Sequence, residues 1–221
     1  MRDGFLNSEF TWFIGVVEDV NDPKFLNRVK VRCYGYHTED TKILSTADLP
    51  FATVMMPTTE ASFKGTGGNH ELMVGSWVVG FFRDGPSAQD PIVMGTIASK
   101  TDETIDIPIE AQLNPPTNKV HKTEGGHLIE YDNTDGAKRI NIKHASGTTI
   151  NINNDGTILI DAVNDIVNID GNTTITGTLH VTGAQTNDST IVAQDTITDS
   201  GATLATHTHP GDSGGNTGTP N

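Results

Sequence analysis

Cysteine and long apolar runs are scarce in this chain of 221 residues. The single cysteine, Cys33, excludes an intrachain disulfide and a cysteine-based zinc site. We expect it to be a small apolar side chain in a strand. No apolar run is long enough to cross a bilayer; the best, residues 77–82, has the length of a buried strand. The first residues show no signal-peptide pattern, so the sequence predicts a soluble protein made in a cytoplasm.

Basic side chains are also few: 14 Lys and Arg stand against 28 Asp and Glu, a formal net charge of −14. This balance disfavours binding of nucleic acid, because phosphate contacts need a basic face. No Phe, Trp or Tyr follows Tyr131, and no Lys or Arg follows Lys143. Hydrophobic residues make up only 34% of the chain, so part of it lacks the means to build its own core.

Residues 1–100 carry nearly all the aromatic side chains and predict an all-β domain. Short apolar or alternating stretches separated by turn residues indicate five strands, at 10–17, 28–34, 49–57, 77–82 and 90–97. The stretch 28–34 alternates charged and apolar residues, which predicts a half-exposed antiparallel strand. Five strands with a long insertion at 36–48 fit a small closed barrel of the OB-fold type.

Residues 101–118 have no sustained periodicity and end in Pro115-Pro116, so we expect an extended linker. From residue 119 to about 205 the chain becomes a ladder of short alternating segments separated by Asn, Asp and Gly. The predicted strands of this ladder are residues 127–131, 139–143, 149–153, 157–161, 166–170, 173–176 and 179–182. Ile150, Ile158 and Ile166 lie eight residues apart, which indicates a stacked repeat.

One copy of this ladder cannot bury enough apolar area to offset roughly 1–2 kcal/mol of backbone entropy for each ordered residue. Each strand offers one or two Ile or Val side chains on one face and Asn, Thr or Asp on the other. Three copies around a common axis would turn the isoleucines inward and leave no free strand edge. The sequence therefore predicts a trimeric β-helical prism.

The end of the ladder carries two histidines one residue apart, His207 and His209. In an extended segment their side chains point to the same face. Three chains meeting on an axis would present six imidazoles to one point. Six nitrogens suit an octahedral transition ion such as Fe(II), Co(II) or Ni(II) better than zinc, which prefers four ligands. With no open position for a substrate, such an ion would be structural.

The residues after this pair, Gly211-Asp212-Ser213-Gly214-Gly215, match the active-serine motif of chymotrypsin-like proteases. Only six residues follow them, too few to complete an oxyanion hole and a specificity pocket. We interpret these small residues as a tight cover over the metal site. The other six histidines, His37, His70, His121, His127, His144 and His180, share no ligand spacing.

The order of barrel, linker, ladder and terminal His-Thr-His-Pro-Gly resembles the central spike proteins of contractile-tail phage baseplates. Residues 15–17, 22–23, 28–32 and 35–37 look like the start of the spike's OB-fold, and residues 206–211 look like its apex. The resemblance implies a homotrimer that docks onto the baseplate hub beneath the tail tube and punctures the host outer membrane. It also implies one iron ion per trimer, held by His207 and His209 of each chain, and a place in the virion.

The resemblance divides the chain into an OB-fold domain at 1–100, a linker at 101–118, a trimeric β-helix at 119–205 and an apex at 206–221. One type of spike carries a lysozyme domain between barrel and ladder, and only the linker occupies that place here, so we expect no enzyme. The spike of a type VI secretion or other contractile injection system is a related alternative. A glycan hydrolase would need paired carboxylates and stacking aromatics. An adhesin would need a recognition pocket. The sequence of the ladder offers neither the paired carboxylates and stacking aromatics of a hydrolase nor an obvious pocket of an adhesin.

Overall fold

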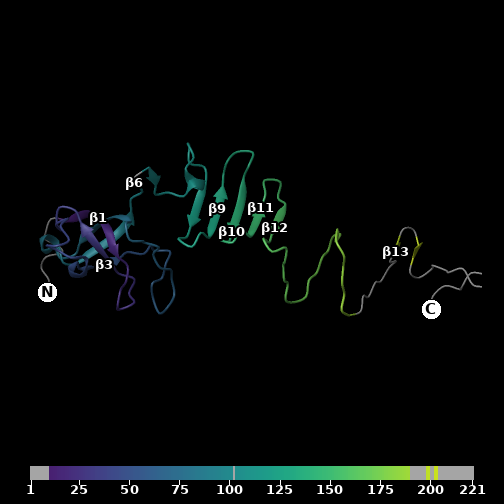
Figure 1. Cartoon of the computed structure of the whole chain (residues 1–221), viewed down its shortest axis with the longest axis horizontal. Coiled ribbons are helices and arrows are strands. Elements are labelled where there is room, and N and C mark those ends of the chain that lie inside the picture. The colour runs from purple at the N-terminus through teal and green to yellow at the C-terminus, as the bar shows by residue number, and fades with distance from the viewer. Residues whose placement is uncertain (1–9, 102, 190–197, 200–201, 204–221) are drawn as a thin grey trace, which may run out of the picture. The chain divides into compact units, whose positions relative to one another are not determined.

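The computed structural model describes residues 10–101, 103–189, 198–199 and 202–203 of the chain. The chain divides into two compact units, residues 1–167 and residues 168–221. The first unit contains a closed five-stranded barrel and a separate five-stranded antiparallel sheet (Figure 1). Among the described residues, no helix has the length and apolar character needed to cross a membrane.

The barrel consists of β1 (Trp12–Asp19), β2 (Val29–Cys33), β3 (Phe51–Val54), β4 (Trp77–Phe82) and β5 (Pro91–Thr96). The strands close in the order β1-β2-β3-β5-β4. All neighbours are antiparallel except β3 and β5, which run parallel. The prediction of a five-stranded closed barrel from residues 1–100 is confirmed.

Alternation along the strands builds the barrel core. Phe13 and Val17 of β1 point inward, as do Val78 and Phe82 of β4, and all four are almost completely buried. Glycine occupies two inward positions where strands approach closely. A Cβ at Gly80 would overlap the carbonyl oxygen of Ile92, and one at Gly15 would lie 2.6 Å from the carbonyl oxygen of Arg32. Cys33 is buried in this core as predicted, and burial raises the pKa of its thiol to about 12.

The segment predicted as an extended linker contains short elements. Two strands of two residues each, β6 (Lys100–Thr101) and β7 (Thr104–Ile105), pair as a short hairpin at its start. The 3-10 turn η3 (Ile109–Ala111) follows. Two further 3-10 turns belong to the barrel loops, η1 (Thr46–Asp48) and η2 (Gly85–Ser87).

The second sheet, which we call the shaft sheet, is an antiparallel meander. It contains β8 (Lys119–Lys122), β9 (Leu128–Asp132), β10 (Arg139–Lys143), β11 (Thr149–Ile152) and β12 (Ile158–Asp161), each paired with the next (Figure 1). Glycine lies in each of its four connecting turns with φ between 76° and 108°, a region that other residues rarely adopt. Four of these strands match the predicted ladder, and β8 was not predicted as a strand.

The ladder prediction fails for a single chain beyond β12. Residues 166–170, 173–176 and 179–182 were predicted as strands, and the structure assigns none of them to a sheet. The physical reason is that a strand needs a neighbouring backbone, and no described segment of the same chain runs beside them. In the second unit, β13 (Thr198–Asp199) and β14 (Ala202–Thr203) form a short hairpin. His207 and His209 lie outside the described residues.

Candidate interaction surfaces

One face of the shaft sheet is apolar on β9 to β12, whereas on β8 the same face carries Lys119 and His121. Residues directly opposite one another in a sheet share a face, and the register aligns isoleucines across β10, β11 and β12. Ile142 lies opposite Ile129 and Ile150, and Ile150 in turn lies opposite Ile160. A second row runs parallel to this one. We call the set the isoleucine face; its members are Ile129, Tyr131, Ile140, Ile142, Ile150, Ile152, Ile158 and Ile160.

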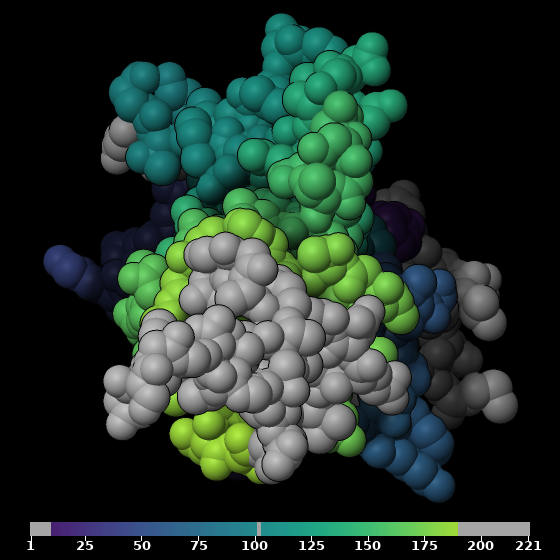
Figure 2. All heavy atoms as spheres, turned by 90° about the vertical axis from the view of Figure 1, so that its right-hand side faces the viewer, coloured from purple at the N-terminus to yellow at the C-terminus, as the bar shows by residue number. Residues whose placement is uncertain are grey.

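Every member of the isoleucine face is exposed in the single chain. The exposed fractions range from 37% for Ile140 to 69% for Ile158. Figure 2 shows atoms in the green of this part of the chain at the surface. A contiguous apolar face of this kind is uncommon on a monomeric protein and marks an interaction site. The prediction that the ladder segregates its isoleucines onto one face is confirmed for β9 to β12.

The opposite face of the shaft sheet is polar and has its own buried centre. The carboxylate of Glu130 is 2% exposed and accepts hydrogen bonds from Asn118 Nδ2 at 2.7 Å and Asn141 Nδ2 at 3.3 Å. Arg139 lies 3.1 Å from its second oxygen. These contacts fix the end of the 101–118 segment to the sheet. The centre of the polar face is therefore hydrogen-bonded within the chain, apart from Asn141 Oδ1, which is buried without a partner among the described residues.

The outward side of β2 is covered by the chain itself. The alternating charges of this strand predicted a half-exposed surface, but all five of its residues are buried. Arg32 donates hydrogen bonds to the carbonyl oxygens of Thr38 and Leu44, and Lys30 donates one to that of Ala47. These carbonyls belong to the insertion 36–48. OB-folds that bind oligonucleotides use the face of strands 2 and 3, and here the insertion lies on β2.

The carboxylate of Glu18 on β1 binds both β2 and the insertion 36–48. Glu18 accepts hydrogen bonds from Arg32 and from the hydroxyl of Thr46, at 2.9 Å and 2.7 Å. The Arg32 hydrogen bond, aided by Thr46, holds the pKa of Glu18 below its usual value. Residues of β1, β2 and the insertion are thus joined in one polar network.

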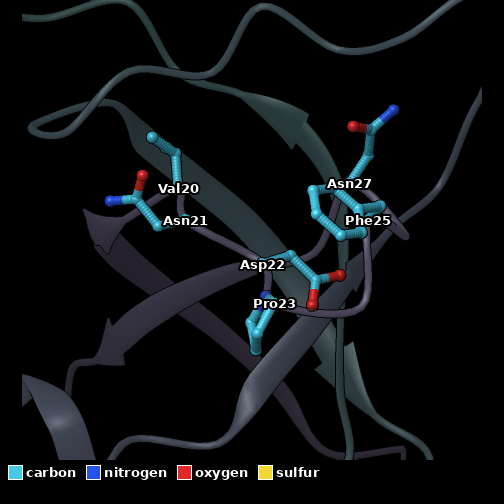
Figure 3. Close-up of a pocket in the computed structure, with 6 residues that line it drawn as sticks. All are labelled: Val20, Asn21, Asp22, Pro23, Phe25 and Asn27. Carbon is cyan, nitrogen blue, oxygen red and sulfur yellow. The ribbon is translucent and has the colours of Figure 1, made fainter.

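The loop between β1 and β2 forms a small pocket beside an exposed aromatic ring. The pocket is lined by Val20, Asn21, Asp22, Pro23, Phe25 and Asn27, and Figure 3 shows the Asp22 carboxylate turned toward the loop segment that carries Phe25. Asp22 pairs with Arg28 at 2.6 Å and accepts hydrogen bonds from the backbone of Lys24 and Leu26. The Arg28 contact holds the pKa of Asp22 well below its usual range. The carboxylate is fully used in shaping the loop.

The structure also brings together two histidines, His127 and His144, whose spacing in the sequence did not indicate a contact. The rings of His127 and His144, from neighbouring hairpin turns, have centroids 4.6 Å apart. The Nδ1 atom of each accepts a backbone N–H, from Ala145 at 3.4 Å and from Ser146 at 3.1 Å. Within the described ranges, no three or more His, Cys, Asp and Glu side chains gather where they could hold a metal ion.

Comparison with known proteins gives the family. Residues 34–200 match the family described as the Gp5 N-terminal OB domain. The chain belongs to this family. The match continues from the barrel through the shaft sheet, so it is not confined to the OB-fold.

Two relatives carry names that agree with the sequence resemblance. Protein Gp5 of Vibrio phage KVP40 is 24% identical over an alignment 282 positions long, and the alignment covers 86% of this chain and 66% of the relative. The pre-baseplate central spike protein Gp5 of Enterobacteria phage T4 is 38% identical over 97 residues, 41% of this chain and 17% of that protein. The chain thus spans about two thirds of the first relative and a small part of the second. The resemblance to central spike proteins is confirmed.

Proposed function

We propose that this chain is a structural central spike at the tip of a phage contractile tail. The observation that carries the proposal is the isoleucine face, an apolar surface across β9 to β12 that is left exposed in a chain of the Gp5 OB family. Three copies that turn this face toward a common axis bury it and leave the polar face, with its hydrogen-bonded Glu130, on the outside. The same packing supplies neighbouring backbones for residues 166–182, which pair with no strand in the described part of their own chain.

In this assembly the parts of the chain take different tasks. Residues 1–100 dock onto the baseplate hub and tail tube, residues 101–118 connect, and residues 119–205 form the trimeric β-helix. Residues 206–221 form the apex that meets the host outer membrane when the sheath contracts. The insertion covers β2, part of the surface through which OB-folds bind oligonucleotides, and this favours a barrel that binds protein and not nucleic acid. We propose no catalytic function, and a location in the virion baseplate.

The proposed apex holds one iron ion per trimer, with His207 and His209 of each chain as six ligands. A neutral imidazole is a good ligand for iron, and six of them fill an octahedral shell. Such an ion would tie together three chain ends that have little apolar surface of their own.

Elemental analysis of the purified chain tests this proposal. We expect one iron ion for every three chains, and we expect a variant with both His207→Ala and His209→Ala to lose it while the barrel stays folded. His180→Ala is the matched control and should keep the iron. Undiminished iron in the double variant would remove the apex from the proposal, and a metal-free wild-type trimer would do the same.

A further inference from the structure

The barrel has an apolar surface on its outside as well as a core within. The register pairs Trp12 with Phe81, Ile14 with Val79 and Val16 with Trp77, and the residues between these pairs point into the core. These pairs therefore face outward. We call this surface the outer barrel patch; it comprises Phe10, Trp12, Ile14, Val16, Tyr34, Trp77, Val79, Phe81, Ile92 and Met94.

The aromatic rings of the patch lie against one another. Phe10 and Phe81 have centroids 5.3 Å apart, and Tyr34 stacks on Trp77 at 5.4 Å. Phe10 is 67% exposed and Trp12 is 56% exposed. Both tryptophans of the chain are here, whereas the core is filled by Phe13, Phe82 and smaller side chains. Placing the largest apolar residues outside the core is unfavourable unless something covers them.

The patch also lacks charge, in a chain whose net charge is −14. None of its ten members is Asp, Glu, Lys or Arg. Charge depletion combined with Trp, Tyr, Phe and Met is the composition of the core of a protein–protein interface. Charge begins at the border of the patch, where Arg32 of β2 lies opposite Val16. Arg32 is already paired with Glu18, and both side chains bind the insertion 36–48.

We propose that the outer barrel patch packs against the barrels of two further copies of this chain. The proposal rests on the trimer of the proposed function, since only residues 97–118 separate β5 from the shaft sheet. Three shaft sheets on one axis hold three barrels at high effective concentration. Copies of an acidic chain repel one another through charged surfaces, and an uncharged apolar face is where they can approach closely. The patch is then buried about the same axis as the isoleucine face.

The two tryptophans make this packing directly measurable in the full chain. Trp77→Phe leaves Trp12 as the sole reporter, and the experiment measures its quenching by acrylamide together with the mass of the particle in solution. The reference is the same variant carrying Ile142→Asp and Ile150→Asp, which we expect to be monomeric. In the trimer, Trp12 should be quenched about three-fold less than in the reference, because the core of an interface excludes small solutes.

Two results would overturn the proposal, and they separate it from the function on which it rests. A trimer in which Trp12 is quenched as strongly as in the monomeric reference would show that no second copy covers the patch, while the trimer stands. In that case protection that appears only after a different tail protein is added would assign the patch to that protein. A monomeric wild-type mass would remove both the trimer and the packing.

Discussion

The barrel and the shaft sheet are both five-stranded, and they use their apolar residues in opposite ways. The barrel closes on itself, so that Phe13, Val17 and Val78 are almost fully buried within one chain. The shaft sheet stays open, and its isoleucine face is between about a third and two thirds exposed. The barrel thus carries its core within one chain, whereas the single chain leaves the isoleucine face of the shaft sheet uncovered, which is why we propose that further copies cover it.

The largest expected effect comes from placing charge on the isoleucine face. Ile142→Asp together with Ile150→Asp would bury carboxylates at the centre of the proposed trimer, at a cost of several kcal/mol for each unpaired charge. We expect the particle to fall from three chains to one in sedimentation equilibrium, while the barrel stays folded and still unfolds cooperatively in urea. Asn151→Asp, on the same strand and the opposite face, should leave the trimer intact. A trimeric double variant would contradict the role of this face.

The next effect separates the barrel from the shaft. Gly80→Ala places a methyl group against the carbonyl of Ile92 and the ring of Phe13, which should destabilise the barrel by about 3 kcal/mol. Gly95→Ala, in the neighbouring strand, meets no atom within 4 Å in the chain and is the control. Urea unfolding followed by tryptophan fluorescence reports on the barrel, and equal midpoints for the two variants would refute the close packing at Gly80.

Removing Arg32 should release the insertion. Its side chain is 6% exposed and joins Glu18 to two carbonyls of residues 36–48, so we expect Arg32→Ala to cost roughly 3 kcal/mol. Arg83→Ala, which removes a half-exposed arginine paired with Asp90, should cost about 0.5 kcal/mol. Faster amide exchange across the insertion in the Arg32 variant alone would support this account. Unchanged exchange there would show that other contacts hold the insertion.

The smallest effect concerns acid stability of the barrel. The pKa of Asp22 is lowered in the folded chain, chiefly by Arg28, so its contribution is present above the unfolded pKa of about 3.9. It is lost as the pH falls through the lowered folded pKa. The difference in melting temperature between wild type and Asp22→Asn should therefore be largest near neutrality and shrink toward pH 2. Glu39→Gln, at an exposed position, serves as the control, and a pH-independent difference for Asp22 would contradict the assignment.

The sequence predicts the barrel well because each of its strands carries its own alternation or apolar run. It does not predict that β2 is covered, because Arg32 and Lys30 look like exposed charges until the insertion folds onto them. Strand β8 was missed because Lys-Val-His-Lys contains a single apolar residue. The predicted strands at 166–170, 173–176 and 179–182 have no partner strand among the described residues, and a pattern along one chain cannot show where such a partner comes from. His207 and His209 lie outside the described residues, so the apex stays a prediction.

The mass of the full chain in solution tests the central claim most directly. One chain has a mass of 23.6 kDa. We predict that sedimentation equilibrium at neutral pH gives three times this value across the concentrations measured, because the isoleucine faces of three copies are buried together. A particle with the mass of one chain would leave that face in water and contradict the account.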